Sequence, residues 1–167
     1  MFGINPAEWF INLPLEWAVF FLSMVPITEL RAAIPIGIEV YGLPIWKVWI
    51  MAVLGDIIPA ILILYFLPLL YYWLRHRRFL GKIITHQLEK AERKFTGKYE
   101  KYGLIGLLLF VGAPLPFTGS WTGSLAAVVF NIPFKKAFFF ILLGVFMAAS
   151  LVTLITLFAG GTLRWLF

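Results

Sequence analysis

The sequence predicts an all-α integral membrane protein with a single membrane domain, and three observations carry that prediction. The 167 residues are 62% hydrophobic and 13% charged, whereas an average soluble domain is about 45–50% apolar and about 25% charged. Residues 75–101 hold nine basic and three acidic side chains, which accounts for the whole net charge of +6. This basic segment separates two apolar halves, and the halves share a pattern of proline, threonine, lysine and glycine.

The composition excludes several classes of protein. A water-soluble globule of this size cannot bury so much apolar surface, which rules out a cytosolic enzyme. Cysteine is absent, so a disulfide scaffold is excluded and no thiolate can hold a metal. We therefore expect no enzymatic activity, no metal site and no other cofactor.

The shared pattern indicates an internal repeat. Residues 25–28 (VPIT) correspond to residues 115–118 (LPFT) at an offset of 90. Residues 44–47 (PIWK) correspond to 133–136 (PFKK), and Leu54-Gly55 corresponds to Leu143-Gly144, both at an offset of 89. We therefore expect each half to contain the same two elements in the same order.

The first of these elements is a re-entrant helical hairpin. After an interfacial helix over residues 1–16, residues 17–42 form an apolar stretch that proline and charged residues interrupt. A membrane-spanning helix needs about 20 mainly apolar residues, so this stretch is too short to cross twice and too polar to cross once. Such backbone is tolerated at membrane depth only where protein or a polar cavity surrounds it. We expect its tip at Pro26, Pro35 and Gly37.

The second element is a membrane-spanning helix over residues 45–74, which is bounded at both ends by tryptophan and tyrosine residues typical of membrane interfaces. A basic amphipathic helix over residues 75–102 joins the halves, because its apolar residues recur every three or four positions. The second half predicts a re-entrant hairpin over 103–131 and a spanning helix over 134–159. The tip of this second hairpin is expected at Pro114, Pro116, Gly119 and Gly123.

The positive-inside rule orients these elements in the cell membrane. It places the basic segment 75–101 in the cytoplasm, where anionic lipids of the inner leaflet are its expected partners. No nucleic-acid-binding motif accompanies the basic residues. The first hairpin then has both ends outside and the second has both ends inside, so the two halves are inverted. Interrupted helices in inverted repeats, with tips meeting near the midplane, are typical of secondary transporters.

Three ionisable residues are expected at membrane depth. Glu29 and Asp56 lie about half a bilayer from the nearest interfacial tryptophans, where a charge costs on the order of 2.5–3.5 kcal/mol. One interpretation makes both acids proton or ion sites, with Arg31 as a counter-ion or substrate group. The other interpretation is an ion pair with Arg31 that only holds the hairpin together. Glu39 is expected at the solvated rim of the hairpin.

Hydroxyl side chains mark both tips. Thr28 lies in the first tip, and Thr118, Ser120 and Thr122 lie in the second. They are candidates to line a polar path or contact the substrate, and they are equally suited to cap helix ends.

At these residues the chain resembles the small multidrug export protein family. The resemblance rests on Pro26-Ile-Thr-Glu29-Leu-Arg31-Ala-Ala-Ile-Pro35-Ile-Gly37 and on Pro114-Leu-Pro116-Phe-Thr118-Gly-Ser-Trp-Thr-Gly123. That family is placed in the wider DedA and SNARE-associated (VTT) superfamily, which implies two inverted re-entrant hairpins and a link to lipid movement. The superfamily carries membrane-embedded acids in its first half, which Glu29 and Asp56 match. It also carries arginine in its second hairpin, and this chain has none there.

These features favour a proton-coupled secondary transporter that moves a lipid phosphate or a small amphipathic compound. The alternative is a non-transport scaffold that organises lipids or partner proteins through the basic helix, and an ion channel is least favoured. Re-entrant backbone must be shielded from lipid, so a homodimer is also expected.

Overall fold

The computed structural model describes residues 13–75, 98–115 and 118–166, and these residues form helices and no strands. The predicted interfacial helix over 1–16 lies almost entirely outside the described residues, as does most of the basic amphipathic helix over 75–102. Two of the described helices are long and apolar enough to cross a membrane, over Ile45–Leu69 and Phe134–Ala159. The all-α class is therefore confirmed for the described residues, and two of their helices have the length and composition of membrane spans.

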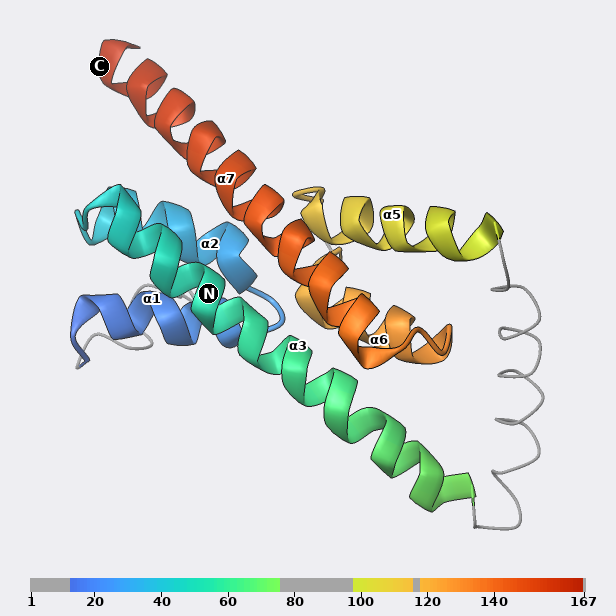
Figure 1. The fold of residues 1–167 in the computed structure, drawn as a ribbon. Helices are drawn as coiled ribbons and strands as arrows, with labels where there is room; N and C mark the ends of the chain where they lie inside the picture. Colours follow the sequence, from blue (N-terminus) through green and yellow to red (C-terminus); the bar gives the residue numbers. More distant parts are fainter. Residues whose placement is uncertain (1–12, 76–97, 116–117, 167) are drawn as a thin grey trace, which may run out of the picture. The chain divides into compact units, whose positions relative to one another are not determined.

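The chain divides into two compact units. The first contains residues up to Ile58 together with residues from Val145 onward, and the second contains Pro59–Gly144. Figure 1 shows the helices of both units. Helices α3 (Ile45–Arg75) and α7 (Phe134–Leu166) each contribute one end to the first unit and the other end to the second.

The first unit is built on a pair of short helices. Helix α1 (Leu15–Met24) turns through residues 25–28 into α2 (Glu29–Pro35), and α2 continues as a π-helical turn, η2 (Ile36–Val40). Helices α1 and α2 lie side by side (Figure 1). Each is too short to span a hydrocarbon core of about 30 Å, because a helix rises about 1.5 Å per residue.

The first tip is shorter than the sequence predicts. Pro26 lies in the turn as expected, but Pro35 and Gly37 lie in the second arm of the hairpin. The arm continues past Pro35 into the π-helical turn, where the Tyr41 N–H donates to the carbonyl oxygen of Ile36 at 2.9 Å. Gly37 packs there against Val48 of α3, whose methyl carbon would lie 2.8 Å from an added Cβ.

The second unit repeats this order of elements. Helix α5 (Lys98–Gly112) and helix α6 (Ser120–Val129) pack against each other, and the residues between them form the second tip. Helix α5 begins before residue 103, so the end of the predicted basic helix and the first arm of the hairpin form one helix. Gly119 precedes α6 and Pro114 lies in the tip, whereas Gly123 lies inside α6. Pro116 lies outside the described residues.

The two units also match in backbone detail. Gly42 and Asn131, which are 89 residues apart, both have positive φ angles, 62° and 54°. Each is followed two residues later by the proline that precedes α3 or α7. Glycine and asparagine are the residues that most readily adopt this left-handed conformation after a helix. The local match agrees with a repeated element, while the inverted arrangement and the re-entrant course remain predictions.

Candidate functional site

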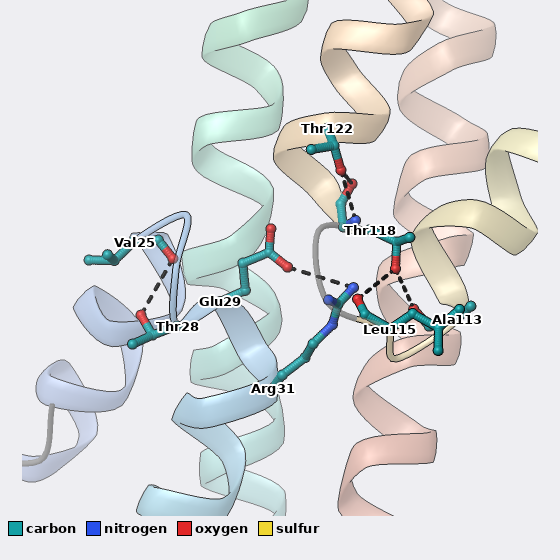
Figure 2. Close-up of polar contacts among 9 residues, drawn as sticks. Val25, Thr28, Glu29, Arg31, Ala113, Leu115, Thr118 and Thr122 are labelled. Carbon is teal, nitrogen blue, oxygen red and sulfur yellow. Dashed lines mark hydrogen bonds and ion pairs between the residues drawn. The ribbon is translucent and has the colours of Figure 1, made fainter.

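The first tip is held by the side chain of Thr28. Its hydroxyl donates hydrogen bonds to the carbonyl oxygens of Leu22 and Val25, and the Thr28–Val25 contact is drawn in Figure 2. The backbone N–H of Glu29 also donates to Val25, at 2.8 Å. These bonds satisfy carbonyl groups at the end of α1 that have no partner within the helix. Thr28 therefore acts as a capping residue in this structure.

Glu29 begins α2 in a conformation that is unusual for a glutamate. Its φ angle is 44°, in the left-handed region, and only 7% of the residue is exposed. A non-glycine residue in this region costs on the order of 1–3 kcal/mol and persists only where its surroundings impose it. Backbone strain of this kind is found preferentially at binding and switching sites, so the conformation of Glu29, as well as its charge, makes it a candidate site residue.

The unusual backbone at Glu29 brings its carboxylate to Arg31. On a regular helix two residues separated by two positions do not face each other. Here a guanidinium nitrogen of Arg31 lies 3.8 Å from a carboxylate oxygen of Glu29 (Figure 2). The side chain of Arg31 is also largely buried. The structure therefore brings together the pair that the sequence placed near the tip.

Asp56 completes this charged cluster from another helix. It lies on α3 within the same unit, is 1% exposed, and is close enough to Arg31 for their charges to interact. We call Glu29, Arg31 and Asp56 the acidic cluster. It contains two carboxyl groups and one guanidinium, so it carries one excess negative charge when every group is ionised. Burying such an excess is costly unless a proton or another cation neutralises it.

Close packing of α1 on α3 positions Asp56. A Cβ added to the neighbouring Gly55 would overlap the carbonyl oxygen of Phe20 in α1. One turn earlier, the buried Ser23 hydroxyl donates to the carbonyl oxygen of Ala52 at 2.6 Å. Sequence analysis did not single out Ser23 or the packing role of Gly55. The Leu54-Gly55 repeat match was the signal that marked Gly55.

A second ion pair joins the same two helices near their first residues. The Lys47 ammonium lies 3.0 Å from a carboxylate oxygen of Glu16 and 5.9 Å from the ring centre of Trp46. The pKa of Glu16 is lowered by a hydrogen bond from its own backbone and, next, by the hydrogen bond from Lys47. Sequence analysis missed this pair, because only the fold shows which charges meet. Glu39, predicted at the rim, is exposed at the end of η2.

The second tip uses its hydroxyl groups as caps. Thr118 donates to the carbonyl oxygens of Ala113 at 2.9 Å and Leu115 at 2.8 Å. Thr122 accepts a hydrogen bond from the Gly119 N–H at 3.0 Å, and Figure 2 shows these contacts. Ser120 is fully buried at the first position of α6. Among the described residues of this tip none is ionisable, whereas the first hairpin carries Glu29 and Arg31 beside its turn.

A model of the protein family described as "Putative small multi-drug export protein" matches residues 29–151. The matched region covers most of the chain and contains the whole acidic cluster. No curated protein and no solved structure matches the sequence.

Proposed function

Because the chain belongs to the small multi-drug export protein family, we propose that it is a proton-coupled membrane exporter of the secondary-transporter type. The acidic cluster is the proposed coupling site. The observation that carries this proposal is the burial of two carboxyl groups around a single guanidinium within one compact unit. The cargo is a lipid phosphate or a small amphipathic compound.

The charge of the cluster supports uptake of one proton. With Glu29, Arg31 and Asp56 all ionised, the cluster carries one excess negative charge, and one bound proton makes it neutral. Ionisable groups at membrane depth are costly and therefore usually serve ion pathways or proton relays. Because both acids interact with the same arginine, the proton belongs to the group as a whole rather than to one acid. Export coupled to proton flow needs such a reversible site.

The contact between Glu29 and Arg31 links proton binding to cargo binding. When Glu29 is protonated it loses its charge, and its attraction to Arg31 falls. The guanidinium then becomes available to an anionic group such as a phosphate, for which its planar donors are well suited. Proton uptake and cargo binding would favour each other by the same factor, as linkage requires. The strained backbone of Glu29 provides a position that can relax when this contact opens.

Transport in reconstituted liposomes under a pH gradient tests the proposal. We would compare wild type with Glu29→Gln and Asp56→Asn, following a labelled isoprenoid phosphate in one set of vesicles and a lipophilic cationic dye in another. We expect gradient-driven movement of one of these cargoes by wild type and background rates for both variants. Glu39→Gln is the matched control, since it removes an exposed acid from the same hairpin.

Two outcomes would overturn the proposal. Transport that still follows the pH gradient in folded Glu29→Gln and Asp56→Asn would show that the cluster is only a structural lock. Failure of folded wild type to move either cargo would refute this transport function and favour the scaffold. Monodisperse gel filtration of each variant establishes that it folds.

A further inference from the structure

An apolar groove lies on the second unit, away from the acidic cluster in the sequence. It has a volume of about 350 Å³ and runs between α5 and α6. Its lining includes Gly103, Gly106, Phe110, Ala127, Phe130 and Ile132. All of the described residues that line it are apolar or glycine. Binding pockets for small molecules measure about 300–1,000 Å³ and usually add a few polar groups, so this groove suits a hydrocarbon chain.

Gly106 differs from Gly123 and Gly144 in its surroundings. A Cβ added at Gly106 would meet no atom of the described residues within 4 Å, whereas one added at Gly123 or Gly144 would overlap Val111. Glycine inside a helix costs about 1 kcal/mol relative to alanine, and close packing is the usual reason to keep it. At Gly106 the missing side chain instead widens the groove. Phe110 and Phe130, both substantially exposed, border this space.

Two lysines follow one end of the groove in the sequence. The lining of the groove runs along α5 from Phe110 to Gly103 and, on the other side, from Ala126 in α6 to Ile132 after it. Exposed Lys135 and Lys136 follow Ile132 almost directly, at the start of α7. An apolar channel that ends beside two lysines matches an amphipathic molecule with one anionic end. Each lysine near an anionic lipid surface favours binding by about 1 kcal/mol, or about five-fold.

We propose that this groove binds a hydrocarbon tail of an anionic bilayer lipid, with the headgroup beside Lys135 and Lys136. The site goes beyond the proposed proton coupling, because it uses neither Glu29 nor Asp56. A lipid tail fits the observations better than a helix of a second copy. Phe110 and Phe130 line the groove together with Gly106, and its volume of about 350 Å³ suits a single acyl chain better than a helix, which is about 10–12 Å across.

Photo-crosslinking without a pH gradient tests this site. Wild type is reconstituted into vesicles containing either phosphatidylglycerol or phosphatidylcholine with a diazirine near the end of one acyl chain. Crosslinked positions are located by mass spectrometry. We expect the phosphatidylglycerol analogue to label the groove residues more than it labels Ile105 and Leu109, which are exposed on α5 but do not line the groove. We also expect the phosphatidylglycerol analogue to label the groove residues more than the phosphatidylcholine analogue does.

Substitutions test the proposed tail site and the proposed headgroup site separately. Gly106→Phe, and Gly106→Leu as a milder second variant, should lower groove labelling several-fold with both lipids, because they fill the space. Ile105→Phe places the same aromatic side chain one residue away, at an exposed position outside the groove, and should leave labelling unchanged. Lys135→Gln with Lys136→Gln should remove the preference for phosphatidylglycerol and keep the labelling by phosphatidylcholine.

Other results would overturn the inference. Equal labelling of the groove and of Ile105 and Leu109 would indicate ordinary contact with bulk lipid. Equal labelling by the two lipids in wild type would refute the headgroup site. The chain has no cysteine, so Gly106→Cys can be oxidised without background. A disulfide between two copies at that position would place a second chain in the groove instead of a lipid. None of these measurements depends on transport.

Discussion

At the scale of single residues, glycine occupies two kinds of position, and they respond differently to substitution. Gly55 lies where α1 crosses α3, and Phe20 leaves no room for a side chain there. Gly106 faces open space in the groove of the second unit. Both lie inside helices, so a methyl group should raise helix propensity at each. The packing around each glycine decides whether this gain in helix propensity also raises the stability of the folded protein.

We predict opposite effects for Gly55→Ala and Gly106→Ala on thermal stability in detergent. Gly55→Ala should destabilise the protein by about 1–3 kcal/mol or more, because the added methyl group meets a backbone carbonyl that cannot rotate away. Gly106→Ala should stabilise it by up to about 1 kcal/mol through helix propensity. Equal melting temperatures for Gly55→Ala and wild type would show that α1 does not pack on α3 as described.

The acidic cluster shows how a local conformation creates a contact that residue spacing alone does not. Glu29 and Arg31 are two positions apart, which on a regular helix would point them in different directions. The positive φ angle at Glu29 changes the direction of the chain, and the pair forms. Sequence analysis identified both residues and left open how they would meet. The pair serves a proton site in our proposal, and the transport experiment separates that role from a purely structural one.

At the scale of elements, α1 is attached to α3 by contacts that advance in the same direction along both helices. The Glu16–Lys47 ion pair lies near the two N-termini, and the Ser23–Ala52 hydrogen bond lies further along. The ion pair is about one-third exposed, so water and salt weaken it. The buried hydrogen bond and the close contact at Gly55 therefore hold this helix pair more firmly than the charges do.

The ion pair predicts a small pH dependence of stability. Because the pKa of Glu16 is lowered in the folded state, its contribution is present above the unfolded-state pKa and is lost as the pH falls through the folded-state pKa. We expect wild type to lose slightly more thermal stability between neutral and acidic pH than Glu16→Gln loses. Glu39→Gln, at an exposed acid outside this pair, is the control and should follow wild type. If Glu16→Gln lost as much thermal stability between neutral and acidic pH as wild type loses, this account would be contradicted.

At the scale of the whole molecule, the inverted arrangement of the two halves is a prediction from the sequence. The matched hairpins and the matched left-handed residues, Gly42 and Asn131, show that the local order of elements recurs. Inversion further requires that α3 and α7 enter the membrane from opposite sides. The predicted homodimer likewise awaits a mass measurement in mild detergent.

Single cysteines test the inversion directly, since the chain has none of its own. Trp46→Cys and Lys135→Cys lie at matched, exposed positions in the first turns of α3 and α7. An impermeant thiol reagent added to intact cells should label Trp46→Cys and should label Lys135→Cys only after the membrane is opened. Labelling of both from the same side would refute the inversion. Reaction of both with a permeant reagent provides the control for reactivity.

Several features could be predicted from the sequence, because they depend on composition and short-range order. The apolar content indicated a membrane protein, and proline with polar residues indicated interrupted helices in both halves. The start of α3 at residue 45 and of α7 at residue 134 followed from the prolines before them. The error at Pro35 and Gly37 arose because the helical arm includes Pro35 and continues beyond it, which residue type alone does not reveal.

The sequence by itself indicated an all-helical membrane protein with Glu29 and several hydroxyl residues near two helix breaks. Only the tertiary structure decided which of those residues meet. Asp56 is buried on α3 close enough for its charge to act on Arg31 of α2, and the hydroxyls of Thr28 and Thr118 donate hydrogen bonds to nearby carbonyl groups. The physical reason is that hydrophobicity and helix propensity depend on individual residues and on their neighbours in the sequence. Ion pairs, close glycine contacts and grooves instead depend on the dihedral angles and packing that bring distant segments together.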